Sequence, residues 1–120
     1  MRILVFEYIT GGGMLGRALT PSLVSEGDLM LRALASDLFE LDGVEVVITR
    51  DARLAPVNLP VECRVVERAE QFREAWESTL CAVDAVWPIA PEQDGALEQV
   101  TAAVVDSGKT LLNSPPSAVR

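Results

Sequence analysis

The sequence predicts an α/β domain built on an open parallel sheet of about five strands, with helices on both faces. Two observations lead to this fold class. Five short apolar segments have the composition of strands buried on both faces, and amphipathic segments with helical spacing separate most of them. Because parallel neighbours need a crossover connection, which a helix supplies, this alternation is typical of a Rossmann-like sheet.

The expected strands begin at the N-terminus with RILVFE, a nearly continuous apolar run that ends in a carboxylate. Each further strand is a short run rich in Val, Ile or Leu, and turn residues such as Asp42-Gly43 and Pro91 bound some of them. The strands are expected at 2–7, 44–49, 63–67, 84–90 and 109–114.

Three helices are expected between these strands, each with an apolar stripe at helical spacing. The start of the first helix stays open, because Ser25 and Asp28 can form a capping box whereas Thr20-Pro21 offers a different N-cap and first turn. The expected helices and their inward residues are 25–41 with Met30, Leu34, Leu38 and Leu41, 70–80 with Phe72, Trp76 and Leu80, and 94–108 with Leu97, Val100 and Val104.

Residues 1–114 are expected to form one α/β domain, since 120 residues are enough chain for a single hydrophobic core. The final residues, NSPPSAVR, place Ser114 before Pro115, which is an N-cap and first-turn signature. Residues 115–120 are therefore expected to start a helix that leads into a further domain, so that the chain is a fragment truncated at Arg120.

Composition excludes several classes of function. A formal net charge of −8, with basic residues scattered among a larger number of acidic ones, argues against a nucleic-acid partner. The absence of histidine excludes Ser-His-Asp and Cys-His catalysis and histidine metal sites. Cys63 and Cys81 lie outside any CxxC motif, and no segment has the apolar length of a signal peptide or a membrane span. A cytoplasmic location without a membrane partner is expected.

The stretch FEYITGGGMLG places Gly11, Gly12 and Gly13 shortly after the first strand. Glycine lets another group approach the backbone closely, which suggests contact with a ligand or packing against a neighbouring domain. Gly11, Gly13 and Gly16 formally match the dinucleotide fingerprint. However, the helix is expected to begin beyond Gly16, so the loop lacks the helix N-terminus that binds pyrophosphate.

Carboxylates follow several strands, and ligands of open α/β sheets bind outside the carboxyl ends of the strands. Glu7 could receive an amine of a substrate, or it could serve as a helix N-cap or bond to N–H groups of the glycine loop. Glu92 is the favoured candidate, with a helix N-terminal role as its alternative, and Glu26 is more typical of a first-turn residue than of a ligand contact. Asp51 and Arg53 are more typical of a surface turn.

Five segments together resemble the N-terminal domain of ATP-grasp ligases, most of all the branch that includes archaeal tyramine–glutamate ligase. They are ILVFEYITGGG, SLVSEGDLMLRALASDL, GVEVVITRDAR, WPIAPEQDGALEQVT and GKTLLNSPPSAVR. The resemblance implies a pre-ATP-grasp domain on the substrate side of a carboxylate–amine ligase. In such enzymes ATP phosphorylates a carboxylate, and an amine then attacks the acyl phosphate.

The resemblance also implies where ATP, Mg²⁺ and the acceptor substrate bind. The chain has a single lysine, Lys109, and nothing that resembles the ATP-clamping strands, so ATP and Mg²⁺ are expected on an ATP-grasp domain beyond Arg120. The chain alone is then expected to hold no cofactor and to be inactive. Its partners would be that domain, a small acceptor substrate and, as an open alternative, a second copy in a homodimer. The residues that match the family's motifs, and so become candidate acceptor contacts, are Glu7, Gly11, Gly12, Gly13, Glu26 and Glu92.

Two other functions stay open from the sequence. One is a dinucleotide-binding Rossmann module of an oxidoreductase, which the formal glycine fingerprint suggests. The other is a non-catalytic, flavodoxin-like interaction domain, although the carboxylates that a receiver module would need after its strands are not evident.

Overall fold

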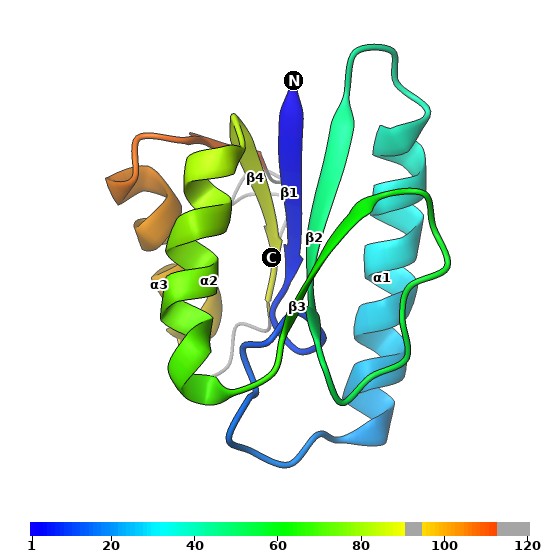
Figure 1. Ribbon diagram of the computed structural model, residues 1–120, viewed down its shortest axis with the longest axis vertical. Coiled ribbons are helices and arrows are strands. Elements are labelled where there is room, and N and C mark those ends of the chain that lie inside the picture. Colours follow the sequence, from blue (N-terminus) through cyan, green and yellow to red (C-terminus); the bar gives the residue numbers. More distant parts are fainter. Residues whose placement is uncertain (91–94, 113–120) are drawn as a thin grey trace.

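A parallel sheet lies at the centre of the computed structural model, which describes residues 1–90 and 95–112 of the chain (Figure 1). Across these residues the sheet has five strands, in the order β3-β2-β1-β4-β5, and every neighbouring pair is parallel. The strands are β1 (Arg2–Glu7), β2 (Glu45–Asp51), β3 (Glu62–Val66), β4 (Ala85–Ile89) and β5 (Thr110–Leu111), and the helices are α1 (Pro21–Phe39), α2 (Ala69–Ala82) and α3 (Ala96–Asp106).

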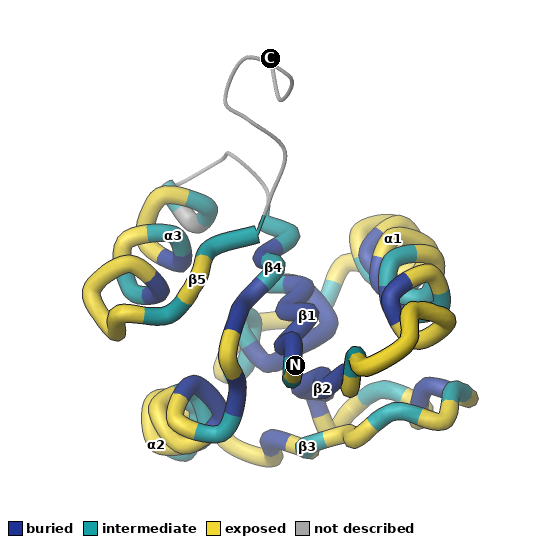
Figure 2. Tube along the Cα trace, turned by 90° about the horizontal axis from the view of Figure 1, so that it is seen from above, coloured by how far each residue is buried: buried dark blue, intermediate teal, exposed yellow. Residues whose placement is uncertain are grey.

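Helices cover both faces of the sheet, as the view along the strands in Figure 2 shows. Alternate residues of β1 face opposite sides, so that Ile3 and Val5 pack with α1, whereas Leu4 and Phe6 pack with α2 and α3. These two apolar clusters sandwich a sheet whose central strands are almost wholly buried. The predicted fold class, a Rossmann-like α/β sheet with helices on both faces, is confirmed.

The predicted inward stripe of helix α1 is correct for Leu38, which is buried, and for Leu34, which packs against the core, but not for its other two residues. The helix begins at Pro21 with Thr20 as N-cap, the second of the two alternatives, and its buried residues are Gly27, Leu31, Ala35 and Leu38. Met30 and Leu41, which were predicted to face inward, are 44% and 54% exposed. Gly27 has no side chain and Ala35 has only a methyl group, so the helix can lie close to the sheet at these positions. A count of large apolar residues overlooks this feature.

The strand boundaries match the predicted ones for β1 and differ for the other strands, with β3 at 62–66 instead of 63–67 and β4 at 85–89 instead of 84–90. β2 continues through Asp51 because Arg50 and Asp51 stay within its ladder with β3. Of the predicted residues 109–114, the structure describes 109–112, and within these β5 comprises Thr110–Leu111. The predicted helix start at residues 115–120 and the candidate Glu92 both lie outside the described residues.

The sheet reverses its winding between β1 and β4. The chain builds outward from β1 to β3 and then returns to add β4 on the other side of β1. In open α/β sheets such a reversal leaves a crevice beyond the carboxyl ends of the two strands, where ligands bind. The loops that follow β1 and β4 therefore define the first place to look for a site. None of the helices in the described ranges is long and apolar enough to cross a membrane.

Candidate functional site

The glycine loop that follows β1 is folded tightly on itself. The N–H of Gly11 donates to the carbonyl of Glu7 (2.7 Å), and the N–H of Gly13 donates to the carbonyl of Tyr8 (3.0 Å). A Cβ atom on Gly11 or Gly13 would lie 2.6 Å from those same carbonyl oxygens. What approaches these two glycines is thus the backbone of their own loop, which explains why side chains are absent there.

Gly12 lets the loop pack on helix α2. Its φ of 107° is in the region that favours glycine. A Cβ there would lie 3.1 Å from the ring of Phe72. Helix α1 begins only at Pro21, so the formal fingerprint ending at Gly16 has no helix N-terminus beside it, as the sequence predicted.

Glu7 is buried at the end of β1, with 2% of its surface exposed. Its carboxylate accepts hydrogen bonds from the N–H groups of Ile9 (3.1 Å) and Thr10 (2.8 Å). The carboxyl group lies against Gly27 of α1, where an added Cβ would be 2.7 Å from the carboxyl carbon. Of the interpretations that the sequence left open, the structure shows the bond to N–H groups of the glycine loop.

The surroundings of Glu7 favour its neutral form. Burial raises the pKa of Glu7, the hydrogen bonds from Thr10 and Ile9 lower it, and the negative charge of Asp28 raises it further. The net direction is upward from the ordinary value of 4.5. This carboxyl group therefore resists ionisation more than a carboxyl group in water does.

Replacing Glu7 by Gln is expected to make the stability of the domain less dependent on pH. Because the folded pKa lies above the unfolded value of about 4.5, the stabilisation from this carboxyl group is complete at lower pH and is lost as pH rises through the folded pKa. The glutamine of Glu7→Gln is neutral at every pH, so the melting temperature of this variant should rise relative to that of the wild type as the pH increases above about 4.5. Thermal unfolding across that range checks this, and a difference that stays constant with pH would contradict it.

An arginine clamp, formed by Asp51 and Arg53, ties the glycine loop to the end of β2. The carboxylate of Asp51 is fully buried and accepts hydrogen bonds from Nε (3.1 Å) and Nη2 (2.8 Å) of Arg53. The same guanidinium donates to the carbonyls of Arg17 (2.6 Å) and Met14 (3.0 Å). The prediction of a surface turn was wrong for Asp51, because this residue belongs to the strand and its charge is used within the fold.

The charge state of Asp51 fits this clamp. Burial alone would raise the pKa of Asp51, but the hydrogen bonds and positive charge of Arg53, together with the charge of Arg50, outweigh it and lower the pKa. The carboxylate is therefore ionised at neutral pH and holds Arg53 in place. Thr49 adds a further tie, since its Oγ1 donates to the carbonyl of Gly11 (2.8 Å).

Arg50 is a second buried arginine at the end of β2, with 3% of its side chain exposed. Its guanidinium forms a two-pronged ion pair with Asp28 of α1 and donates from Nε (3.0 Å) and Nη2 (2.7 Å) to the carbonyl of Ala55. The pair joins α1 to the sheet. The sequence does not reveal this role, because Arg50 directly follows an apolar run and the predicted strand ends at Thr49.

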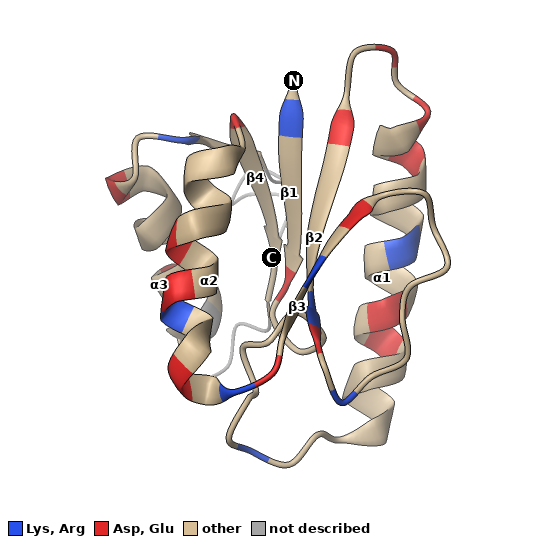
Figure 3. Cartoon of the chain, viewed as in Figure 1, with Lys and Arg blue, Asp and Glu red and all other residues tan. Residues whose placement is uncertain are grey.

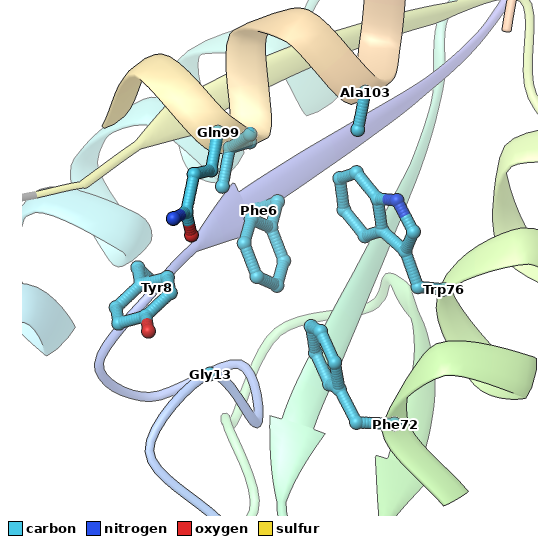
Figure 4. A pocket seen from close by; sticks show the side chains of 8 residues that line it. Phe6, Tyr8, Gly13, Phe72, Trp76, Gln99 and Ala103 are labelled. Atoms are coloured by element: carbon cyan, nitrogen blue, oxygen red, sulfur yellow. The ribbon is translucent and has the colours of Figure 1, made fainter. Parts of the chain in front are cut away.

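An aromatic pocket opens on the other side of β1, between α2 and α3. Its volume is about 290 Å³ (Figure 4). The ring of Phe6 forms its floor and lies 4.7 Å from the ring of Trp76 and 5.9 Å from that of Phe72, measured between centroids. Gly13 of the glycine loop and Ala103 of α3 also line it, and their small size leaves the space open.

One end of the aromatic pocket is polar. Figure 4 shows the side chains of Tyr8 and Gln99 on one side of Phe6, while Trp76 and Phe72 lie on the other. An apolar group with a polar substituent would place its apolar part against the rings and its polar part toward the hydroxyl and the amide. The pocket adjoins the reversal between β1 and β4, since the N–H of Tyr8 donates to the carbonyl of Ile89 (2.8 Å).

The predicted site residues do not all meet. Gly13 lines the aromatic pocket and Gly12 contacts its wall, whereas Glu7 lies on the opposite, α1 side of the sheet. Glu26 is exposed on α1. Figure 3 shows charged residues dispersed over the helices and strand ends rather than gathered in a basic patch. In the part of the chain that the structure describes, no three acidic or cysteine side chains come together as metal ligands.

Fold and site together define a class of protein: a Rossmann-like α/β domain with an aromatic pocket beside the reversal between β1 and β4. The pre ATP-grasp 3 domain family matches residues 44–119, which is more than half of the chain, and the chain belongs to this family. No curated protein sequence matches it.

A solved structure shows the same fold. It is the crystal structure of a protein from Archaeoglobus fulgidus assigned to the ATP-grasp superfamily, which is similar to this chain with a TM-score of 0.65 and 22% sequence identity. The similarity covers 95% of this chain but 33% of that protein. The chain thus spans about one third of the length of this relative.

Proposed function

We propose that this chain is the substrate-side domain of an ATP-dependent carboxylate–amine ligase of the ATP-grasp superfamily. The observation that carries the proposal is the aromatic pocket, which lies beside the strand reversal of a pre-ATP-grasp domain. A ligase needs a place that selects and orients the molecule to be joined, and a preformed, mostly apolar pocket with a few polar groups serves that purpose.

The described residues do not suit ATP and Mg²⁺. The glycine loop has no helix N-terminus beside it, Lys109 is the single lysine of the chain, and the described carboxylates do not cluster as metal ligands. Phosphoryl transfer depends on such groups to neutralise the phosphates. Their site would therefore lie on a separate ATP-grasp domain, which would face the carboxyl ends of the strands in this chain.

The pocket would contact the substrate, and the glycine loop would hold one wall of the pocket in position. In this proposal the rings of Phe6, Phe72 and Trp76 hold an apolar group, and Tyr8 with Gln99 orients its polar end. Glu7 then acts as a positioning residue, since its carboxyl group fixes the N–H groups of the loop that carries Gly13. Glu26 and Glu92 remain proposed acceptor contacts.

The ring-lined wall also supports the finer proposal of an aromatic amine as acceptor, as in the tyramine–glutamate ligase branch. Stacked and edge-on contacts with Phe6 and Trp76 would favour a planar ring over an alkyl chain. The Tyr8 hydroxyl and the Gln99 amide could then bind a phenolic hydroxyl or an ammonium group.

A hydroxamate assay on the natural polypeptide that carries this domain tests the proposed function. Incubation with ATP, Mg²⁺, glutamate and hydroxylamine should give a ferric-staining hydroxamate and ADP, because hydroxylamine attacks the acyl phosphate in place of the natural amine. Tyramine should compete with hydroxylamine, whereas hexylamine should compete weakly. ADP release that does not depend on any carboxylate among a panel of amino acids and dicarboxylates would overturn the ligase proposal.

Filling the pocket is expected to impair amine binding selectively. Ala103→Leu places added methyl groups inside the pocket, so the KM for the amine should rise by about tenfold or more while the KM for ATP stays unchanged. Ala102→Leu is the matched control, because Ala102 is exposed on the neighbouring position of α3. Steady-state kinetics with each substrate varied separately would check this. Equal KM values for the two variants would contradict the role of the pocket.

A further inference from the structure

Strand β3 forms one edge of the sheet and pairs with β2 on its inner side. Figure 2 shows it at the end of the row of strands, beside α2. Cys63 and Val65 are exposed there, and Val65 has 58% of its surface in solvent although it is a large apolar residue. A hollow of about 360 Å³ lies between the end of this strand and α2.

Within residues 1–90 and 95–112, no strand pairs with the outer side of β3. The carbonyl of Val66 accepts from the N–H of Ala52, which follows β2, so Val66 directs its carbonyl toward β2. Successive residues of a strand direct their N–H and C=O groups to opposite edges. Cys63 and Val65 therefore direct theirs outward, where they form a template for another strand.

Two opposite charges flank Cys63 on this edge. Glu62 and Arg64 both point toward the α2 side, where Arg64 donates to Thr79 of α2 (3.4 Å) and pairs with Glu62 (2.8 Å). The hydrogen bond from Arg64 lowers the pKa of Glu62, and the charge of Arg2 acts in the same direction, so Glu62 is ionised at neutral pH. The edge thus carries a negative and a positive side chain at positions separated by one residue.

We propose that a second copy of this chain binds to the β3 edge as an antiparallel strand, with Cys63 of the two copies opposite each other. In this register Glu62 of each copy faces Arg64 of the other, and the outward N–H and C=O groups of the two Cys63 residues pair. A register shifted by one residue on each strand would place Glu62 against Glu62, or Arg64 against Arg64. The charges therefore select one alignment, because like charges directly opposite each other destabilise a sheet.

The resulting dimer would have a two-fold axis through Cys63 and one sheet running through both copies. It covers the exposed Val65 by placing it opposite Val61 of the other copy. Such an isologous contact is the commonest way in which identical chains associate. The inference rests on the edge strand alone and is independent of the proposed ligase function.

Sedimentation velocity of the 120-residue chain over a range of concentrations tests the dimer through its charges. The wild type should shift from monomer to dimer as concentration rises. Arg64→Glu and Glu62→Arg should each be monomeric, since each puts like charges opposite each other, whereas an equimolar mixture of the two should dimerise. Circular dichroism confirms that each variant is folded. A wild type that stays monomeric at millimolar concentration, or a mixture that stays monomeric while both variants are folded, would overturn the proposal.

Cross-linking of the native cysteine provides a test that needs no charge change. Residues in a hydrogen-bonded antiparallel pair have Cα atoms about 5.5 Å apart, which is within reach of a disulfide. Copper phenanthroline with oxygen as oxidant should therefore couple two Cys63 thiols, with loss of two protons and two electrons, in the wild type and in Cys81→Ser. Cys63→Ser should give no covalent dimer. Cross-linking through Cys81 instead would count against the β3 interface.

Discussion

Replacing Arg50 by Ala is expected to lower the free energy of unfolding of the domain by about 3 kcal/mol or more, which is typical of a broken buried ion pair. The guanidinium is almost fully buried and bonded to both Asp28 and the carbonyl of Ala55. Its removal leaves a half-buried carboxylate and a carbonyl group without their partner and opens a cavity between α1 and β2. Urea unfolding followed by circular dichroism measures the loss.

Two matched variants separate this effect from a general loss of charge. Arg50→Lys keeps the charge but not the two-pronged geometry, so it should fall between the wild type and Arg50→Ala. Arg73→Ala removes an exposed partner of Glu77 on α2, and its effect should stay below about 0.5 kcal/mol. If Arg50→Ala were as mild as Arg73→Ala, the pair with Asp28 would contribute little to the fold.

Replacing Gly27 by Ala is expected to destabilise the domain by about 1–3 kcal/mol through overpacking. A loss of stability is unusual for this substitution, because a Gly-to-Ala change within a helix ordinarily stabilises it by up to about 1 kcal/mol. At Gly27 the new methyl group would overlap the carboxyl group of Glu7, which is itself held by Ile9 and Thr10. Thermal and urea unfolding of the single variant show directly whether the substitution lowers or raises the free energy of unfolding.

A double-mutant cycle with Glu7→Ala identifies the cause. Shortening Glu7 removes the atoms that the methyl group meets, so the effect of Gly27→Ala should become much smaller, or favourable, in that background. The coupling between the two positions should exceed about 1 kcal/mol. Additive effects would show that the cost at Gly27 arises from something other than Glu7.

The order and type of the elements were predictable because strands and helices differ in their apolar period. The all-apolar runs around Val5, Ile48 and Val86 are buried strands, and Leu80, Val100 and Val104 face the core as expected. The stripe on α1 was only partly predicted, because Gly27 and Ala35 bury no large side chain yet set how closely the helix approaches the sheet.

The site was harder to predict because it depends on contacts between distant parts of the chain. Nothing local shows that Arg53 holds the carbonyl of Met14, 39 residues earlier, or that Thr49 bonds to Gly11. Phe72 and Trp76 were correctly placed on an inward helix face, but that pattern is the same for a filled core. They line a pocket because small residues on two other elements, Gly13 and Ala103, leave space in front of them.

The central position of β1 has a consequence for how the protein is made. This strand is synthesised early, yet it pairs with β4 in a register that joins Ile3 to Ala85, and Arg2 donates its N–H to the side chain of Asp84, 82 residues later. One edge of this central strand therefore stays without its neighbour until most of the domain has left the ribosome. Pairing over such a separation slows folding and leaves a nascent chain prone to aggregation. Folding of this domain accordingly waits for the synthesis of β4, and until then chaperones that bind apolar nascent segments can reach β1.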